Sequence, residues 1–134
     1  MNHPKHEAGP SCAGCDSRML QAAEELRKFF YWAKSAHHDL HCSWAYRGEA
    51  DQNAAKASGA SNAKFGESKH NVLPSQAIDL FQIIDGKPVF DGVFCVRLFK
   101  ASQLAGFKLR NGGDFKTKRG GKLVSLGDYG HFEV

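Results

Sequence analysis

The first long hydrophobic pattern of the chain has helical spacing and runs from residue 16 to Ala36. Asp16 or Ser17 can cap its start. Its apolar positions recur on one helical face: Met19, Ala22, Ala23, Leu26, Phe29, Phe30 and Ala33. We therefore predict one amphipathic helix over residues 16–36.

A strand, a helix and a loop are predicted next. Residues 40–46 alternate between apolar and polar, as in a short strand, and Arg47 lies at its exit. Residues 49–57 are typical of a second helix, which Gly59 ends. Glycine, serine and asparagine dominate residues 58–71, so we expect a loop there.

The middle of the chain predicts a hairpin. Residues 76–84 alternate, and Asp85-Gly86, a dipeptide that favours tight turns, precedes a returning strand at residues 88–90. Residues 92–105 form an amphipathic helical pattern, and short strands are expected at residues 107–109 and 131–134. These elements predict an α+β domain, a small antiparallel sheet with flanking helices.

Composition and charge narrow the class of protein. The chain has 134 residues, 42% of them hydrophobic, which suffices for a single core. We expect a flexible arm over residues 1–15 and one domain over residues 16–134. No apolar run approaches the ~20 residues of a membrane span, so no membrane insertion is expected. A net charge of +4 suits a polyanionic partner. The densest basic stretch, which we interpret as a solvated loop, holds Lys116, Lys118, Arg119 and Lys122.

The N-terminal sequence and the cysteines point to synthesis in a cytosol. The first residues lack the apolar stretch of a secretory signal. Four cysteines are too few for a secreted disulfide framework, and we expect Cys42 and Cys95 to fill the core.

Three polar residues are difficult to explain as parts of the fold alone: His70, Asp79 and His131. Asp79 interrupts an apolar strand, so its carboxylate needs a partner, and a cation would provide one. Two imidazoles and one carboxylate form the open ligand set of a hydrolytic zinc ion. Asp128, three residues before His131, could place a free carboxylate beside it.

Two segments carry a family resemblance. SKHNVLPSQAIDL at residues 68–80 and GDYGHFEV at residues 127–134 resemble the VanY-like D-Ala-D-Ala carboxypeptidases and L-Ala-D-Glu endopeptidases, in particular small phage endolysins. The segment before residue 71 is similar to the family's stretch with an arginine and a downstream glutamine, and NGGDF at residues 111–115 is similar to its GGDW element. The resemblance covers residues 40–134 and implies a hedgehog/DD-peptidase-like fold.

The resemblance also implies site roles. It assigns three zinc ligands: His70, Asp79 and His131. Asp128 would be the catalytic base, Arg47 would stabilise the oxyanion, and Ser68 would contact the substrate or a metal ligand. The sequence departs from the family pattern at Gly130, where proline is usual, and at Phe115, where tryptophan is usual.

The resulting expectation is a monomeric zinc peptidase that cuts the stem peptide of bacterial peptidoglycan and binds no nucleic acid. We expect a phage endolysin, made in the host cytoplasm and acting on the cell wall after release, with L-Ala-D-Glu as the bond cut. The alternatives are a D-Ala-D-Ala carboxypeptidase of cell-wall turnover and a non-catalytic, zinc-containing wall-binding module.

A second metal site is a further alternative. Cys12 and Cys15, followed by His37 and His41, supply the ligand types of a Cys2His2 zinc site. The competing interpretation is a flexible arm followed by histidines at a helix end. If such a site exists, a nucleic-acid-binding module becomes the competing class.

Overall fold

The computed structural model describes residues 3–119, 122–125 and 127–134. The helices are α1 (Ala13–Met19), α2 (Glu24–Ala36), α3 (Glu49–Ala57), the single 3-10 turn η1 (Lys69–Asn71) and α4 (Gly92–Leu104). The strands are β1 (Leu40–Trp44), β2 (Ala77–Ile84), β3 (Lys87–Val89), β4 (Arg110–Gly112), β5 (Lys116–Arg119), β6 (Lys122–Ser125) and β7 (Asp128–Glu133).

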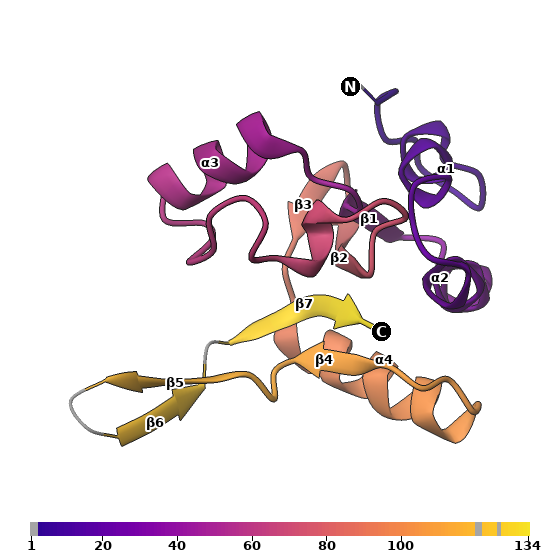
Figure 1. Ribbon diagram of the computed structural model, residues 1–134. Helices are drawn as coiled ribbons and strands as arrows, with labels where there is room; N and C mark the ends of the chain where they lie inside the picture. The colour runs from indigo at the N-terminus through magenta and orange to yellow at the C-terminus, as the bar shows by residue number, and fades with distance from the viewer. Residues whose placement is uncertain (1–2, 120–121, 126) are drawn as a thin grey trace.

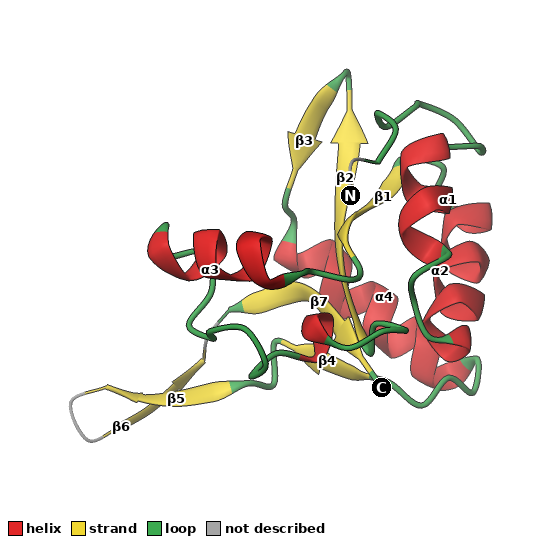
Figure 2. Ribbon diagram, turned by 45° about the horizontal axis from the view of Figure 1, so that its top comes forward, coloured by secondary structure: helices red, strands yellow, loops and turns green. Residues whose placement is uncertain are grey.

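The main sheet is antiparallel and confirms the predicted α+β class. Its strand order is β1-β2-β7-β4, with β3 paired to the outer part of β2. Figure 1 shows α1 and α2 together beside β1, and α4 beneath β4 and β7. Helix α3 lies on the side of the molecule opposite to α1 and α2. The hairpin β5–β6 forms a separate sheet that projects from the body in both views (Figures 1 and 2). The four basic residues of the expected solvated loop fall on this hairpin, and their side chains lie outside the described part of the chain.

The core lies on one face of the sheet. Phe132 of β7 packs against Phe29 of α2, with ring centroids 4.9 Å apart, and against Phe99 of α4 at 6.3 Å. Ile78 is the register partner of Phe132, and Asp79 is that of His131. Because successive side chains of a strand point to opposite faces, the pair Asp79 and His131 lies on the face away from this core.

The predicted single helix over residues 16–36 is wrong, since the structure has two helices there. Residues 20–23 leave the helical path because their backbone binds Ser75 instead: Ser75 N–H donates to Gln21 O at 2.6 Å, and Ala23 N–H donates to Ser75 O at 2.8 Å. Long-range hydrogen bonds replace local helical ones at residues 20–23. The helical spacing of apolar residues continues across this break, so it does not indicate that the helix is interrupted.

The predicted boundary at residue 15 falls inside α1, which begins at Ala13. Cys12 and Cys15 are buried in the core, as are Cys42 and Cys95. The segment before α1 is also fastened to it, because Ala13 N–H donates to Glu7 Oε1 and His3 Nδ1 lies 2.7 Å from Ser17 Oγ.

The strand predicted at residues 107–109 is displaced to β4. Phe107 packs against Phe29 and Trp32 of α2, with ring centroids 5.8 and 5.3 Å away, so this segment serves the core rather than the sheet. The last strand begins at Asp128 instead of His131. In the part of the chain that the structure describes, no helix has the length and apolar character needed to cross a bilayer.

Candidate functional site

The structure brings His70, Asp79 and His131 together. His70 Nε2 lies 3.2 Å from Asp79 Oδ2, and His131 Nδ1 lies 3.2 Å from Asp79 Oδ1. One donor atom from each residue falls within 4.8 Å of the other two. Nitrogen and oxygen ligands of a tetrahedral zinc ion are about 3.4 Å apart, so the spacing suits such an ion.

His70 is held with a lone pair facing the carboxylate. Its Nδ1 lies 2.7 Å from the carbonyl oxygen of Ala45, which can only accept, so Nδ1 is a donor and Nε2 is the nitrogen that faces Asp79. Nε2 is buried, and in the described chain it has no hydrogen-bond partner, although Asp79 Oδ2 is close. Two electron-pair donors facing each other at this distance favour a cation between them, and the three residues therefore fit a metal ion.

Glu133 orients the second histidine. His131 Nε2 lies 2.9 Å from Glu133 Oε1, which directs Nδ1 toward Asp79. Glu133 is itself buried and paired with Lys69 at 2.9 Å and Arg110 at 3.3 Å. A carboxylate behind a metal-binding histidine is a common support for the ligand. Glu133 was not among the residues predicted from the sequence, although its position two residues after His131 on the same strand face was an available signal.

Arg47 reaches the site through a buried hydrogen-bond network. Its Nη2 lies 3.4 Å from Asp79 Oδ2, and its Nη1 donates to Gln52 Oε1 at 3.1 Å. Gln52 also accepts from Asn71 Nδ2 at 3.1 Å and donates to the carbonyl of Ala63 at 2.7 Å. The guanidinium carbon lies over the Trp44 ring, 4.7 Å from its centroid. Gln52 therefore joins α3, the loop after it and η1 around Arg47.

Asp128 begins β7 and lies beside the three residues. Its Oδ2 is 3.8 Å from His131 Nδ1, and its side chain is 54% exposed. Its register partner on β4 is Gly112. A carboxylate close to the ligands and open to solvent can accept a proton from a water molecule at the site.

Ser68 has a local structural role as well as a place beside the site. Its hydroxyl accepts from His70 N–H at 3.1 Å and forms a capping box with Asn71 at the start of η1. It therefore fixes the backbone that carries His70.

All six predicted site residues line one cavity of about 440 Å³: Arg47, Ser68, His70, Asp79, Asp128 and His131. The loop over residues 59–63 forms its opposite wall. A second cavity of about 260 Å³ shares three lining residues with the first: Asp79, Gly127 and Asp128. Phe90 and Tyr129 line only this second cavity. The two cavities thus meet beside the three metal-type ligands.

The pKa values of three site residues are shifted by their neighbours. Burial raises the pKa of Asp79, but His70 and His131 outweigh it and hold the pKa well below its usual range. Burial lowers the pKa of His131, yet the carboxylates of Asp79 and Glu133 bring it above the ordinary value. Partial desolvation raises the pKa of Asp128, and the negative charge of Asp79 raises it further.

The alternative metal site predicted from Cys12, Cys15, His37 and His41 is wrong in one ligand. Cys12, Cys15 and His41 lie together, but their fourth neighbour is His6, not His37. His37 ends α2 and packs edge-on against Phe94, with ring centroids 5.0 Å apart.

The architecture is a small antiparallel sheet with a histidine–aspartate–histidine group beside a polar cavity. Among solved structures, the chain is similar to the L-Ala D-Glu endopeptidase ChiX of Serratia marcescens, with a TM-score of 0.65 and 20% sequence identity over 90% of this chain and 85% of that one. This similarity shows the fold. No protein-family model matches the chain. A search of curated proteins likewise gives no match.

Proposed function

We propose that this protein is a zinc-dependent peptidoglycan peptidase that hydrolyses an amide bond of the stem peptide, and we assign L-Ala-D-Glu as the bond. The observation that carries the proposal is the meeting of three metal-type ligands, the carboxylate of Asp128 and the guanidinium of Arg47 in one cavity. The fold shared with an L-Ala D-Glu endopeptidase supports the substrate class.

His70, Asp79 and His131 would hold the zinc ion. When bound, the ion would lower the pKa of a water molecule toward ~7 and polarise the scissile carbonyl. Glu133 keeps His131 in the orientation that ligation needs.

Asp128 would act as the general base. It takes a proton from the attacking water as the water oxygen bonds to the carbonyl carbon, and it delivers that proton to the nitrogen of the leaving amine. The C–N bond breaks, and the products are a carboxylate and an amine. The exposed carboxylate lies 3.8 Å from His131 Nδ1, which supports the proposed transfer.

Arg47 would stabilise the negative charge that develops on the carbonyl oxygen. Arg47 is 7% exposed and the orientation of its guanidinium is preset by Gln52, so little reorganisation is needed when the charge appears.

Two cavities on either side of Asp128 support an endopeptidase. Cleavage inside a chain requires room for residues on both sides of the scissile bond, whereas removal of one terminal residue requires room mainly on one side. The cavity beside Arg47 and that beside Tyr129 meet at the metal-type ligands and offer both. The resemblance to phage endolysins supports a role in host lysis, with the protein acting on the wall after release as a monomer.

The test is digestion of purified peptidoglycan, with the fragments identified by mass and the bound zinc measured in the same samples. The wild-type protein is compared with Asp128→Asn and with Asp114→Asn, a matched control because Asp114 is exposed and lies outside the cavity. We expect new L-Ala carboxyl ends from the wild type and from the control. Asp128→Asn should retain zinc and lose about 10²–10⁴-fold in rate.

Each other outcome has a defined meaning. Released D-Ala would replace our bond assignment with a D-Ala-D-Ala carboxypeptidase. A wild-type protein that holds zinc and binds peptidoglycan without cutting it would overturn the peptidase proposal in favour of a wall-binding module.

A further inference from the structure

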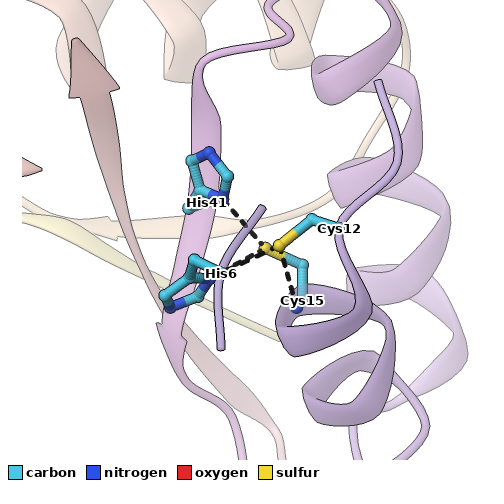
Figure 3. A group of neighbouring side chains, drawn as sticks. All are labelled: His6, Cys12, Cys15 and His41. Carbon is cyan, nitrogen blue, oxygen red and sulfur yellow. Dashed lines mark hydrogen bonds between the residues drawn. The ribbon is translucent and has the colours of Figure 1, made fainter. Parts of the chain in front are cut away.

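A second group of metal-type side chains lies away from the cavity, between the N-terminal segment, α1 and β1. It consists of His6, Cys12, Cys15 and His41, which we call the cysteine cluster (Figure 3). Cys12, Cys15 and His41 are at most 1% exposed. Its four donor atoms lie within 4.8 Å of one another. The residues come from three separate parts of the chain, so the fold and not a local sequence motif brings them together.

The distances within the cysteine cluster match tetrahedral coordination. His6 Nδ1 lies 3.5 Å from both Cys12 Sγ and Cys15 Sγ, and His41 Nδ1 lies 3.4 Å from Cys15 Sγ. Zinc–sulfur and zinc–nitrogen bonds of ordinary length at tetrahedral angles place sulfur and nitrogen about 3.6 Å apart. Each imidazole thus directs Nδ1 at the same point as the sulfurs, as Figure 3 shows.

Backbone N–H groups donate to both sulfurs of the cluster. Cys12 Sγ accepts from the N–H groups of Glu7 at 3.3 Å and Cys15 at 3.4 Å. Cys15 Sγ accepts from Cys42 N–H at 3.4 Å. Thiolate is both the stronger hydrogen-bond acceptor and the form that binds metal, so these donors support coordination.

His41 is costly to bury without a ligand. It is fully buried, and its Nε2 has no hydrogen-bond partner among the described residues. Its Nδ1 contacts the sulfur of Cys15. A weak contact with a thiol compensates little of the lost hydration of an imidazole. A metal–nitrogen bond at Nδ1 would compensate much more.

Gly14 lets the N-terminal segment reach the cluster. A Cβ atom at this position would lie 2.7 Å from the carbonyl oxygen of Pro4 and 3.0 Å from that of Lys5. The segment therefore passes directly over α1, and this path carries His6 to the cysteines. Glycine between Cys12 and Cys15 is thus required by the close approach of the two backbones.

We propose that His6, Cys12, Cys15 and His41 bind a second zinc ion, with a structural role. Four protein ligands leave no open position for water or substrate, so this ion would be non-catalytic. It would fasten the N-terminal segment and α1 to β1, the strand whose exit leads to Arg47. The proposal does not depend on peptidase activity, because its ligands are separate from those lining the cavity.

The first test is zinc content per chain in the full-length protein. We expect about two zinc ions in the wild type and about one in each of Cys12→Ser/Cys15→Ser and His70→Ala, which lose different ions. Cys95→Ser is the matched control, since Cys95 is also a buried free cysteine but lies outside the cluster. It should retain both ions. Chelation of the His70→Ala protein should lower its Tm.

The second test needs no variant that could misfold. Wild-type protein loaded with Co²⁺ in place of zinc should show a sulfur-to-cobalt charge-transfer absorption, which His70, Asp79 and His131 cannot produce. His6→Gln, a change at a partly exposed residue, should weaken that band, and Cys95→Ser should not. The proposal is overturned if the wild type shows no such band, if its zinc content is unchanged by Cys12→Ser/Cys15→Ser, or if its mass reveals a Cys12–Cys15 disulfide as purified.

Discussion

Asp79 and His131 are register partners across β2 and β7, and Asp79 Oδ1 lies 3.2 Å from His131 Nδ1. Their strand neighbours Ile78 and Phe132 are also register partners, and both are fully buried. A shift of one residue would turn the apolar pair out of the core, so the core fixes the register. The same register brings a carboxylate and an imidazole from distant parts of the chain into one site.

Glu133→Gln should weaken metal binding at His131. The variant keeps the shape of the side chain but loses the carboxylate that His131 Nε2 faces at 2.9 Å. We expect zinc affinity to fall about 10–100-fold, measured by competition with a chelator. Glu24→Gln, on the exposed surface of α2, is the control. Equal affinities for Glu133→Gln and the control would contradict a supporting role.

Arg47→Lys should lower kcat more than it raises KM. Lysine keeps the positive charge but cannot contact both Gln52 and Asp79 with a planar fork, as Arg47 does. Loss of a donor that acts on the developing oxyanion costs about 10²–10³-fold in kcat. Steady-state kinetics on a stem-peptide substrate measure the relative changes in kcat and KM, with Arg97→Lys at an exposed position of α4 as the control. A change confined to KM would assign Arg47 to ground-state binding.

Gly112→Ala should displace Asp128. A Cβ atom at Gly112 would overlap the carbonyl oxygen of Asp128, so β4 and β7 must move apart. We expect the free energy of unfolding, measured with urea, to fall by about 1–3 kcal/mol. Activity should fall by a larger fraction than stability, because Asp128 is displaced. At Gly48 the nearest atom is 3.7 Å from such a Cβ, and Gly48→Ala should have the smaller effect. Similar activities in the two variants would refute the requirement.

Cys95 should make the fold less stable at alkaline pH. Burial, aided by the charge of Asp91, raises the pKa of its thiol to about 11, whereas an exposed thiol ionises near ~8.5. Between these values the unfolded chain binds fewer protons than the folded one, so stability falls as pH rises. From about pH 8 to about pH 10, the wild type should lose on the order of 2 kcal/mol more than Cys95→Ala in urea unfolding. Parallel pH profiles for the two proteins would contradict this.

Local patterns predicted much of the fold. The helix over residues 49–57, the hairpin after β2 and the α+β class followed from periodicity and turn residues, and all are present. The break between α1 and α2 could not be predicted in this way, because its cause is the backbone of Ser75, more than fifty residues along the chain.

The site shows the same division between local and long-range information. His70, Asp79 and His131 were singled out as polar residues without a structural reason, and the structure brings them together. The downstream glutamine of the resemblance is Gln52, but its hydrogen bond to Arg47 could not be predicted from local pattern. Glu133 resembled an ordinary polar strand residue, since its role lies in its contact with His131. His6 was missed because no spacing rule links it to the cysteines. Their proximity depends on the close approach that Gly14 allows.

The position of β7 within the sheet has a consequence for the timing of folding. β7 follows every other element in the chain, yet it lies between β2 and β4 and carries Asp128 and His131. Until β7 inserts, the edge of β2 that pairs with it is unpaired. His131 is then not yet beside Asp79, and the cavity is incomplete. The site therefore forms only when β7 takes its place in the sheet, because β7 carries two of the residues that line the cavity.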